Sequence, residues 1–414
     1  MDAETAEDLT MPADEALSTD PDDLLIELMS EPQPADPYPL YHALRSVAPN
    51  FPSILGVRFL SSHAACLDML RSTAFQNGFG SGADEFADHP FIKMTKEILI
   101  FTNPPQHTRM RRLAAFAFTP KTVVNLRPAV QAFVDERLDA MADAGKSEIM
   151  ADLGSPVPAM VVCKLLDAPM DDYAMVQAWV DAVSAPMKPV LEADLIELAD
   201  AATIEFDAYI KDLIAARRRN LGDDLLSRLI AAEEDGDRLT TTELANLLFT
   251  IIAAGNETTA GLITTGTYLL LSNPEQRVRL GERPELIENT IDEILRYESP
   301  LQNVFMRFAL EDTEIDGEPI IQNEQVMGLI AAANRDPAVF PDPDRFDIER
   351  TNLNETLAFG HGIHFCIGRA IGRQTGVVTL GSLFRRFPDM RLAAEPTWRK
   401  TLPSRRLDRL DVLL

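Results

Sequence analysis

Positive charge is missing from the start of this sequence. Residues 1–44 contain no lysine or arginine, and the first basic side chain is Arg45. Because the same stretch is rich in aspartate and glutamate, its composition favours a solvated, disordered segment. We expect residues 1–36 to form a disordered acidic tail and residues 37–414 to form the folded domain. The formal net charge of −27 disfavours nucleic acids and anionic membrane surfaces as partners.

Cysteine is scarce, and uninterrupted apolar runs are absent. The three cysteines, Cys66, Cys163 and Cys366, are too few and too scattered for a disulfide framework. The most apolar stretch, residues 244–271, is interrupted by two asparagines and a glutamate, so no membrane span is expected. The acidic opening residues also lack the apolar segment of a secretory signal. These absences predict a cytoplasmic protein without a membrane anchor.

Helical periodicity dominates the rest of the chain. Apolar residues recur at steps of three and four in residues 40–47, 63–70, 130–141, 160–166, 173–183, 195–216 and 225–232. The longest predicted helix starts at a capping-box spacing, Thr240 to Glu243, and continues to Ser272. Strand-like pieces are short, at residues 53–60, 304–310 and 319–326. With no linker after the tail, we predict a mainly α fold: one large helical domain with small β-sheets and a long central helix.

The loop Phe359–Gly368 contains a cysteine between closely spaced glycines. Helical periodicity follows it, so Cys366 lies at a helix N-terminus, where the helix dipole and free N–H groups lower the pKa of a thiol. Such a thiolate is suited to bind a metal ion. Taken alone, the loop also fits a turn with an incidental cysteine. A zinc site is disfavoured because only His361 and His364 lie nearby, and no base or triad partner suggests a catalytic thiol.

This loop resembles the haem-binding loop of the cytochromes P-450. Three further segments match that family in order and spacing: the Glu-x-x-Arg motif at residues 293–296, the meander at residues 335–346, and the oxygen-binding groove at residues 254–259. The resemblance runs from about Pro37 to the C-terminus, and it is closest to the bacterial type that lacks a membrane anchor. It implies a monomeric haem-thiolate protein containing haem b, iron protoporphyrin IX.

The resemblance also implies which residues hold the haem. Cys366 corresponds to the proximal iron ligand, and a thiolate in that position favours O–O cleavage. His107 and Arg111 share one helix face, and with Arg307 and His364 they correspond to the family's propionate-binding positions. For any single arginine the alternative is a surface ion pair, which contributes only about 0–1 kcal/mol.

Two further groups of residues follow from the resemblance. In the long helix the Thr258 hydroxyl can bond to the Ala254 carbonyl, and the acid–alcohol pair Glu257 and Thr258 supplies protons for oxygen activation. Glu293, Arg296 and the meander residue Arg345 form a buried structural network that holds the cysteine loop in place. The expected substrate pocket is lined by the loop between Phe75 and Phe101 and by Leu247, Ile251, Ala254, Leu301, Val304 and Phe305.

The activity implied is that of a monooxygenase, which inserts one atom of dioxygen into an apolar organic substrate. Electrons come from NAD(P)H through a reductase and a ferredoxin. The ferredoxin is expected to dock on a basic face made by Arg109, Arg112, Arg369 and Arg373. The alternatives are a non-catalytic haem protein that senses gas or redox state, and a peroxide-driven enzyme of the same family.

Overall fold

The computed structural model describes residues 17–30, 34–78, 85–169, 172–186, 192–234, 236–399 and 404–414. The α-helices are α1 (Pro21–Met29), α2 (Tyr38–Val47), α3 (His63–Arg71), α4 (Pro90–Glu97), α5 (Gln106–Ala115), α6 (Pro120–Ala144), α7 (Pro156–Leu166), α8 (Tyr173–Ser184), α9 (Ala193–Arg219), α10 (Leu225–Ala231), α11 (Thr241–Ser272), α12 (Pro274–Glu282), α13 (Ile287–Tyr297), α14 (Ile330–Asn334) and α15 (Arg369–Arg386). Among the described residues, a π-helical turn (Met150–Gly154) and three 3₁₀ turns (Pro284–Leu286, Leu353–Glu355 and Gly362–His364) accompany them. The predicted mainly α class is confirmed.

The strands are short and form five small sheets among the described residues. The largest has the order β1-β2-β10-β7-β3, with β2 and β10 parallel and the other pairs antiparallel. Its strands are β1 (Asn50–Pro52), β2 (Val57–Leu60), β10 (Gln325–Gly328), β7 (Arg307–Ala309) and β3 (Phe75–Asn77). The other sheets are β11-β14-β4 (Arg391–Leu392, Asp411–Leu413, Lys146–Glu148), β12-β13 (Thr397–Trp398, Leu407–Arg409), β5-β6 (Glu233–Glu234, Asp237–Arg238) and β8-β9 (Thr313–Ile315, Glu318–Ile320).

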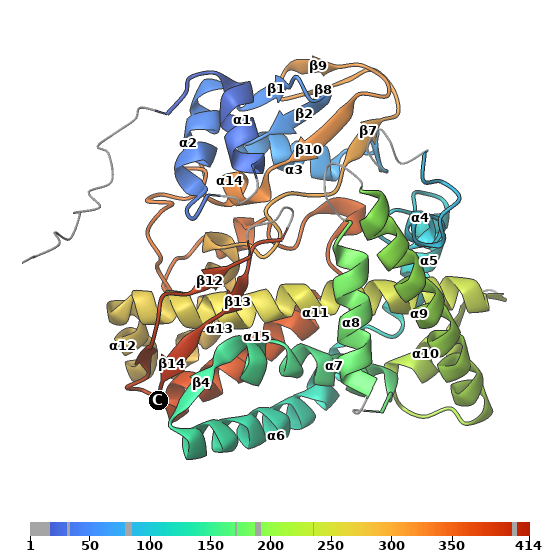
Figure 1. The fold of residues 1–414 in the computed structure, drawn as a ribbon. Helices are drawn as coiled ribbons and strands as arrows, with labels where there is room; N and C mark the ends of the chain where they lie inside the picture. Colours follow the sequence, from blue (N-terminus) through green and yellow to red (C-terminus); the bar gives the residue numbers. More distant parts are fainter. Residues whose placement is uncertain are drawn as a thin grey trace, which may run out of the picture.

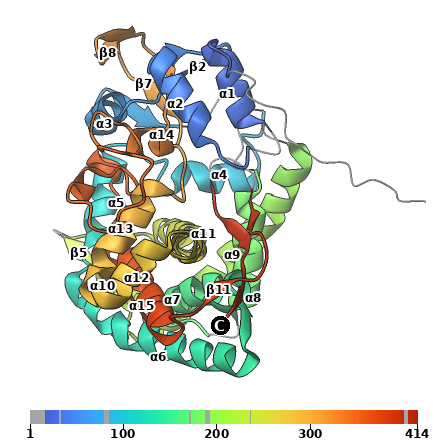
Figure 2. The same cartoon turned by 90° about the vertical axis from the view of Figure 1, so that its left-hand side faces the viewer.

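Helix α11 crosses the whole helical part of the molecule (Figure 1). In Figure 2 this helix is seen almost end-on, near the centre of the molecule. The predicted capping box starts it: the Thr240 hydroxyl accepts the Glu243 N–H, and the Glu243 carboxylate accepts the Thr240 N–H. A stretch of α11 is long and apolar enough to span a membrane, but 72% of it is buried inside the domain. It is therefore the core helix around which the other helices pack.

The acidic segment is partly folded, so the predicted disordered tail through residue 36 is wrong for α1. Asp20 caps this helix by accepting the Asp22 N–H, and proline occupies its first position. Leu24, Leu25 and Leu28 are buried in a core cluster with α2 and the first two strands. Residues 1–16 and 31–33, which belong to the same prediction, lie outside the described residues.

Candidate functional site

The cysteine loop is held against α3 by backbone contacts. Its ends are closed by the hydrogen bond from the Cys366 N–H to the Phe359 carbonyl, 3.0 Å long. Gly360 and Gly362 both have left-handed backbone angles, with φ of 68° and 67°. A Cβ at Gly362 would lie 2.2 Å from the carbonyl oxygen of Leu70, so no other residue fits there. The two glycines therefore let the loop turn tightly and approach α3 directly.

Cys366 is an exposed residue, and its sulfur receives hydrogen bonds from the backbone N–H groups of Gly368 and Arg369. Desolvation nevertheless raises the pKa of this thiol, and outweighs the two N–H groups and the charges of Arg111 and Arg369. The sequence prediction of a lowered pKa is therefore wrong for the net effect, although the backbone N–H groups act in the predicted direction. A bound metal cation would supply the remaining stabilisation that the thiolate needs.

Four basic side chains gather beside this loop from separate elements: His107 and Arg111 from α5, Arg307 from β7, and His364 from the loop itself. The rings of the two histidines lie 4.2 Å apart. Burial, together with nearby cations, lowers the pKa of His107 to about 4 and that of His364 to about 3. Burial alone lowers the pKa of Arg307 to about 10. A negatively charged group bound at this cluster would therefore be strongly favoured electrostatically.

No carboxylate among the described residues forms an ion pair with any of these four side chains. Arg111 donates instead to the carbonyl of Phe365, and Arg307 donates to the carbonyl of Met69 at 2.9 Å. Both ring nitrogens of His107 and Nε of Arg307 are buried without a hydrogen-bond partner in the described part of the chain. Since buried polar atoms are nearly always paired, these atoms indicate an anionic ligand with oxygen acceptors.

Most of helix α11 is buried, but its middle part has a stripe of residues that are accessible to solvent. Ala254 is exposed, and Ile251, Gly255 and Thr258 are half-buried; these positions share one helix face. The nearest atom to a Cβ built on Gly255 is 4.0 Å away. The Thr258 hydroxyl donates to the Ala254 carbonyl at 2.7 Å, as the sequence predicted. The stripe therefore offers a hydroxyl and open space beside an apolar surface.

The carboxylate of Glu257 does not stand free next to this hydroxyl. Its Oε1 accepts from Arg399 at 3.0 Å and from the Ser404 hydroxyl at 2.9 Å, and lies 3.7 Å from Nε of Arg406. These partners could not be predicted from the local sequence, because they lie more than 140 positions away in the C-terminal segment. Glu257 is thus an ion-paired carboxylate at the edge of the stripe.

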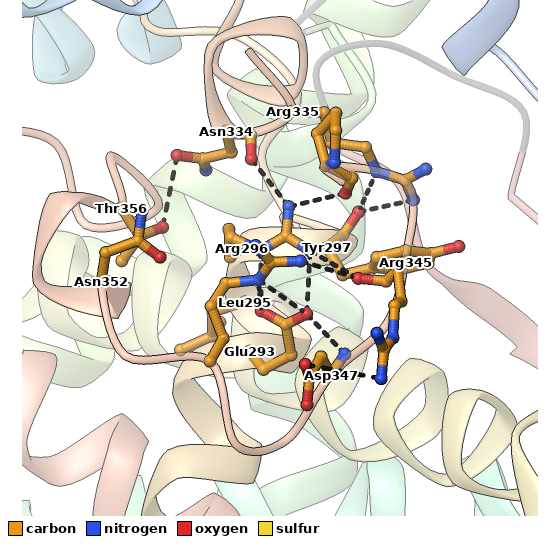
Figure 3. A network of polar contacts seen from close by, with 12 residues as sticks. Glu293, Leu295, Arg296, Tyr297, Asn334, Arg335, Arg345, Asp347, Asn352 and Thr356 are labelled. Carbon is orange, nitrogen blue, oxygen red and sulfur yellow. Dashed lines mark hydrogen bonds and ion pairs between the residues drawn. The ribbon is translucent and has the colours of Figure 1, made fainter. Parts of the chain in front are cut away.

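A buried ion pair on α13 is part of the network drawn in Figure 3. Glu293 and Arg296 are both fully buried, with Nε of Arg296 2.7 Å from the Glu293 carboxylate. Arg296 also donates to the carbonyls of Asn334 and Pro343, at 3.0 Å and 2.9 Å. The predicted structural pair is therefore present, and it joins α13 to the meander.

The prediction that the Arg345 side chain is the third member of this network is wrong. Its side chain is 61% exposed and points to Asp347, and only its backbone carbonyl accepts from Arg296, at 3.3 Å. The arginine that reaches Glu293 is Arg350, which is 8% exposed and has Nε 3.4 Å from the carboxylate. The backbone path of the meander decides which arginine points inward, and sequence spacing did not reveal it.

The expected substrate-pocket residues do not share one environment. Ile251 and Ala254 lie on the stripe, while Leu301, Val304 and Phe305 are half-buried in the segment that leads into β7. Leu247 has no exposed surface and is part of the central core.

Of the residues expected to form a basic face, Arg109 binds Asp237 and Glu243, and Arg373 binds Asp292 and Glu288. Both charges are neutralised within the chain, so the expected basic face is wrong for these two arginines.

Comparison with known proteins decides the family. The family profile described as Cytochrome P450 matches residues 68–390. The chain belongs to the cytochrome P450 family. It is 36% identical to the cytochrome P450 monooxygenase PikC of Streptomyces venezuelae, over 87% of this chain and 86% of that protein. It is 34% identical to the vitamin D(3) 25-hydroxylase of Pseudonocardia autotrophica, over 92% and 94%.

Solved structures give the same assignment for the fold of this P450. The crystal structure of P450BioI in complex with an acyl carrier protein ligated to hexadec-9Z-enoic acid superposes with a TM-score of 0.86. The two chains are 32% identical, and the match covers 92% of this chain and 98% of that one. This P450 is thus a haem-thiolate monooxygenase that uses haem b and dioxygen, with reducing equivalents from NAD(P)H through reductase partners.

The residues of this P450 fit the cofactor. The unpartnered nitrogens of His107 and Arg307, together with Arg111 and His364, match the two negatively charged propionates of haem. Cys366, with its two N–H donors, matches the requirement for an axial thiolate. When bound, the haem supplies the oxygen activation and oxygen transfer that no side chain can perform. In this arrangement Cys366 would serve as the ligand, the basic cluster would bind the propionates, and α11 would contribute its accessible surface.

Replacing Arg111 by alanine is expected to lower the haem content of the purified protein severalfold. The change removes one cation from the cluster that would bind the propionates, and charge-assisted hydrogen bonds of this kind contribute about 1.5–3 kcal/mol. Haem content is measured from the absorbance of the bound haem relative to protein. Arg112→Ala, one position along α5 on an exposed face, is the matched control and should retain haem. Full haem content in the Arg111 variant would remove this residue from the propionate set.

Proposed function

We propose that this P450 inserts one oxygen atom into a large, mainly apolar substrate, and that Thr258 organises the proton supply. The observation that supports it is the accessible stripe of α11, where a hydroxyl lies beside Ile251, Ala254 and Gly255. The vitamin D(3) 25-hydroxylase and the fatty-acyl complex of P450BioI support the same substrate class by their names. Polar groups at the stripe are few, so desolvation of apolar surface would contribute most of the binding free energy.

We propose a separate ferredoxin as the electron donor and the cytoplasm as the site of action. The scarcity of cysteine supports a reducing compartment. Because Arg109 and Arg373 are neutralised by acidic neighbours, the docking face must rely on other cations near the cysteine loop. Arg369 is an exposed candidate: it lies three positions after Cys366, and its guanidinium is 5.6 Å from the ring centroid of Phe359.

Thr258→Ala tests the proposal. Haem content, substrate binding and iron reduction should stay unchanged, while product formed per NAD(P)H oxidised falls at least about tenfold, since positioned proton transfer contributes about 10²–10⁴-fold. The missing reducing equivalents should appear as hydrogen peroxide. The assay uses the holoenzyme with a ferredoxin, its reductase and apolar candidates such as steroids and fatty acids.

Thr267→Ala is the matched control for this experiment. Thr267 makes the same hydroxyl-to-carbonyl bond in α11, to Ile263 at 2.8 Å, but it is fully buried away from the stripe. An unchanged product ratio in Thr258→Ala would make Thr258 a helix-packing residue. Product formation with hydrogen peroxide but with no ferredoxin would favour the peroxide-driven alternative. A wild-type protein that forms no product under either condition would favour the non-catalytic sensor.

A further inference from the structure

The C-terminal hairpin β12-β13 is seated on α11 next to Glu257. The Trp398 ring meets the Tyr268 ring of α11 edge-on, with centroids 5.7 Å apart, and the guanidinium of Arg405 covers Trp398 at 4.1 Å. A Cβ on Gly261 would lie 3.3 Å from Cβ of Arg406, so a glycine lets the hairpin approach the helix closely. The hairpin is therefore fixed to α11 one turn beyond Glu257.

Two arginines of this hairpin converge on the same carboxylate. The Arg399 N–H donates to the Arg406 carbonyl at 2.8 Å, which sets both side chains beside Glu257. Arg406 is 8% exposed at its side chain, and burial and the nearby Arg399 lower the pKa of its guanidinium. Glu257 and Asp408 oppose that effect. Two neighbouring guanidinium groups can remain charged here because the two carboxylates compensate them.

The contacts on Glu257 are asymmetric. Arg399, Ser404 and Arg406 all approach Oε1, at 3.0, 2.9 and 3.7 Å. Within the described part of the chain, no hydrogen bond is made to Oε2. A carboxylate that served only as a structural anchor for two arginines would be expected to bind them with both oxygens, as bidentate pairs do. Here one oxygen is held by hydrogen bonds and the other is not, while the Glu257 side chain is 19% exposed and directly precedes Thr258 in the sequence.

We propose that Arg399 and Ser404 are positioning residues for proton supply: they hold Glu257 by Oε1 so that Oε2 exchanges protons with water beside Thr258. A proton from solvent water forms a bond to Oε2 and later leaves it for water on the Thr258 side. The carboxylate returns to its anionic form, and no electrons are transferred. This inference rests on the proposed function, since it names the residues that orient the acid.

Arg399→Gln in the holoenzyme is the direct test. Misplacing a reacting group by about 1 Å can reduce a rate about 10²-fold, so we expect product per NAD(P)H to fall about tenfold or more. The solvent kinetic isotope effect on product formation should rise, because proton delivery becomes slower. Arg409→Gln makes the same charge change in the same hairpin at a residue that pairs with Asp411, and it should behave as wild type. Arg399→Lys should restore part of the loss.

Ser404→Ala is a milder second variant, which removes one donor to Oε1 and keeps the two guanidinium groups. It should lower the product ratio in the same direction as Arg399→Gln. Hydrogen–deuterium exchange provides a readout that does not depend on turnover. In Glu257→Gln, exchange in β12 and β13 should increase, because a neutral amide cannot compensate both arginines.

The outcomes separate this inference from the proposed function. If Thr258→Ala loses product while Arg399→Gln and Ser404→Ala keep the wild-type ratio and isotope effect, the positioning role is wrong and the proposed function stands. If Arg399→Gln only lowers the denaturation midpoint, with the ratio unchanged, the hairpin contact is purely structural. If Thr258→Ala also leaves the ratio unchanged, the proton-supply role that the proposed function gives to Thr258 fails as well.

Discussion

Cys366→Ser is expected to abolish product formation with every substrate and electron donor. A bound metal ion can deprotonate a thiol outright, and the resulting thiolate donates electron density that favours O–O cleavage. A serine hydroxyl is a far poorer source of such a ligand at the same position. The backbone N–H groups of Gly368 and Arg369 would then face a neutral oxygen in place of an anionic sulfur. Product is measured by chromatography in a ferredoxin-supported assay.

The control for this variant is Cys163→Ser. Cys163 is buried in α7, where burial raises the pKa of its thiol, so it is a core residue in a different part of the chain. It should retain wild-type turnover per bound haem. The haem content of Cys366→Ser is compared with that of Arg111→Ala, because Cys366→Ser leaves the basic side chains expected to bind the propionates unchanged. Turnover that survives in Cys366→Ser would mean that another residue supplies the ligand.

Glu293→Ala is expected to lower the free energy of unfolding by about 3–5 kcal/mol, because it leaves a fully buried guanidinium without its counter-ion. Glu293 accepts two hydrogen bonds from Arg296, at 2.7 and 2.8 Å, and one from the Asp347 N–H at 2.8 Å. The bond from Asp347 joins α13 to the end of the meander segment that precedes the cysteine loop, and Arg296 makes further bonds to the carbonyls of Asn334 and Pro343. The change should therefore also reduce the recovery of haem-containing protein. Denaturant titration of the purified protein measures the effect.

Two arginine variants make this prediction specific. Arg350→Ala should also be destabilising, because Arg350 is 8% exposed and reaches Glu293 at 3.4 Å. Arg345→Ala should change the stability by no more than about 0.5 kcal/mol, since its side chain is exposed and only its carbonyl takes part. If Arg345→Ala destabilises the protein as much as Arg350→Ala, the assignment of the meander arginine is wrong.

Local patterns were sufficient where neighbouring residues determine the structure. The capping box at Thr240 and the apolar content of the following residues predicted both ends of α11. The hydrogen bond from Thr258 to Ala254 follows from a four-residue spacing within one helix. Helix α1 could have been predicted in the same way, because Asp20 followed by proline is a capping signal and Leu24 and Leu28 share a face. The acidic composition of the segment outweighed this signal in the prediction.

Contacts between distant segments could not be predicted in this way. Glu257 and Arg399 are 142 positions apart, and nothing in either local sequence shows that they meet. The orientation of Arg345 and Arg350 depends on how the meander backbone folds over α13. The net pKa of Cys366 depends on desolvation by the whole surrounding structure, which exceeds the local effect of the helix N-terminus. Tertiary packing decides each of these features.

The absorption spectrum of the reduced carbon monoxide complex tests the central claim most directly, because its long-wavelength Soret band depends on a thiolate ligand. We expect the band in the wild-type protein and in Cys163→Ser, and its complete loss in Cys366→Ser at comparable haem content. A wild-type protein that binds haem without showing the band, or a Cys366→Ser protein that retains it, would contradict the assignment of Cys366 as the haem ligand.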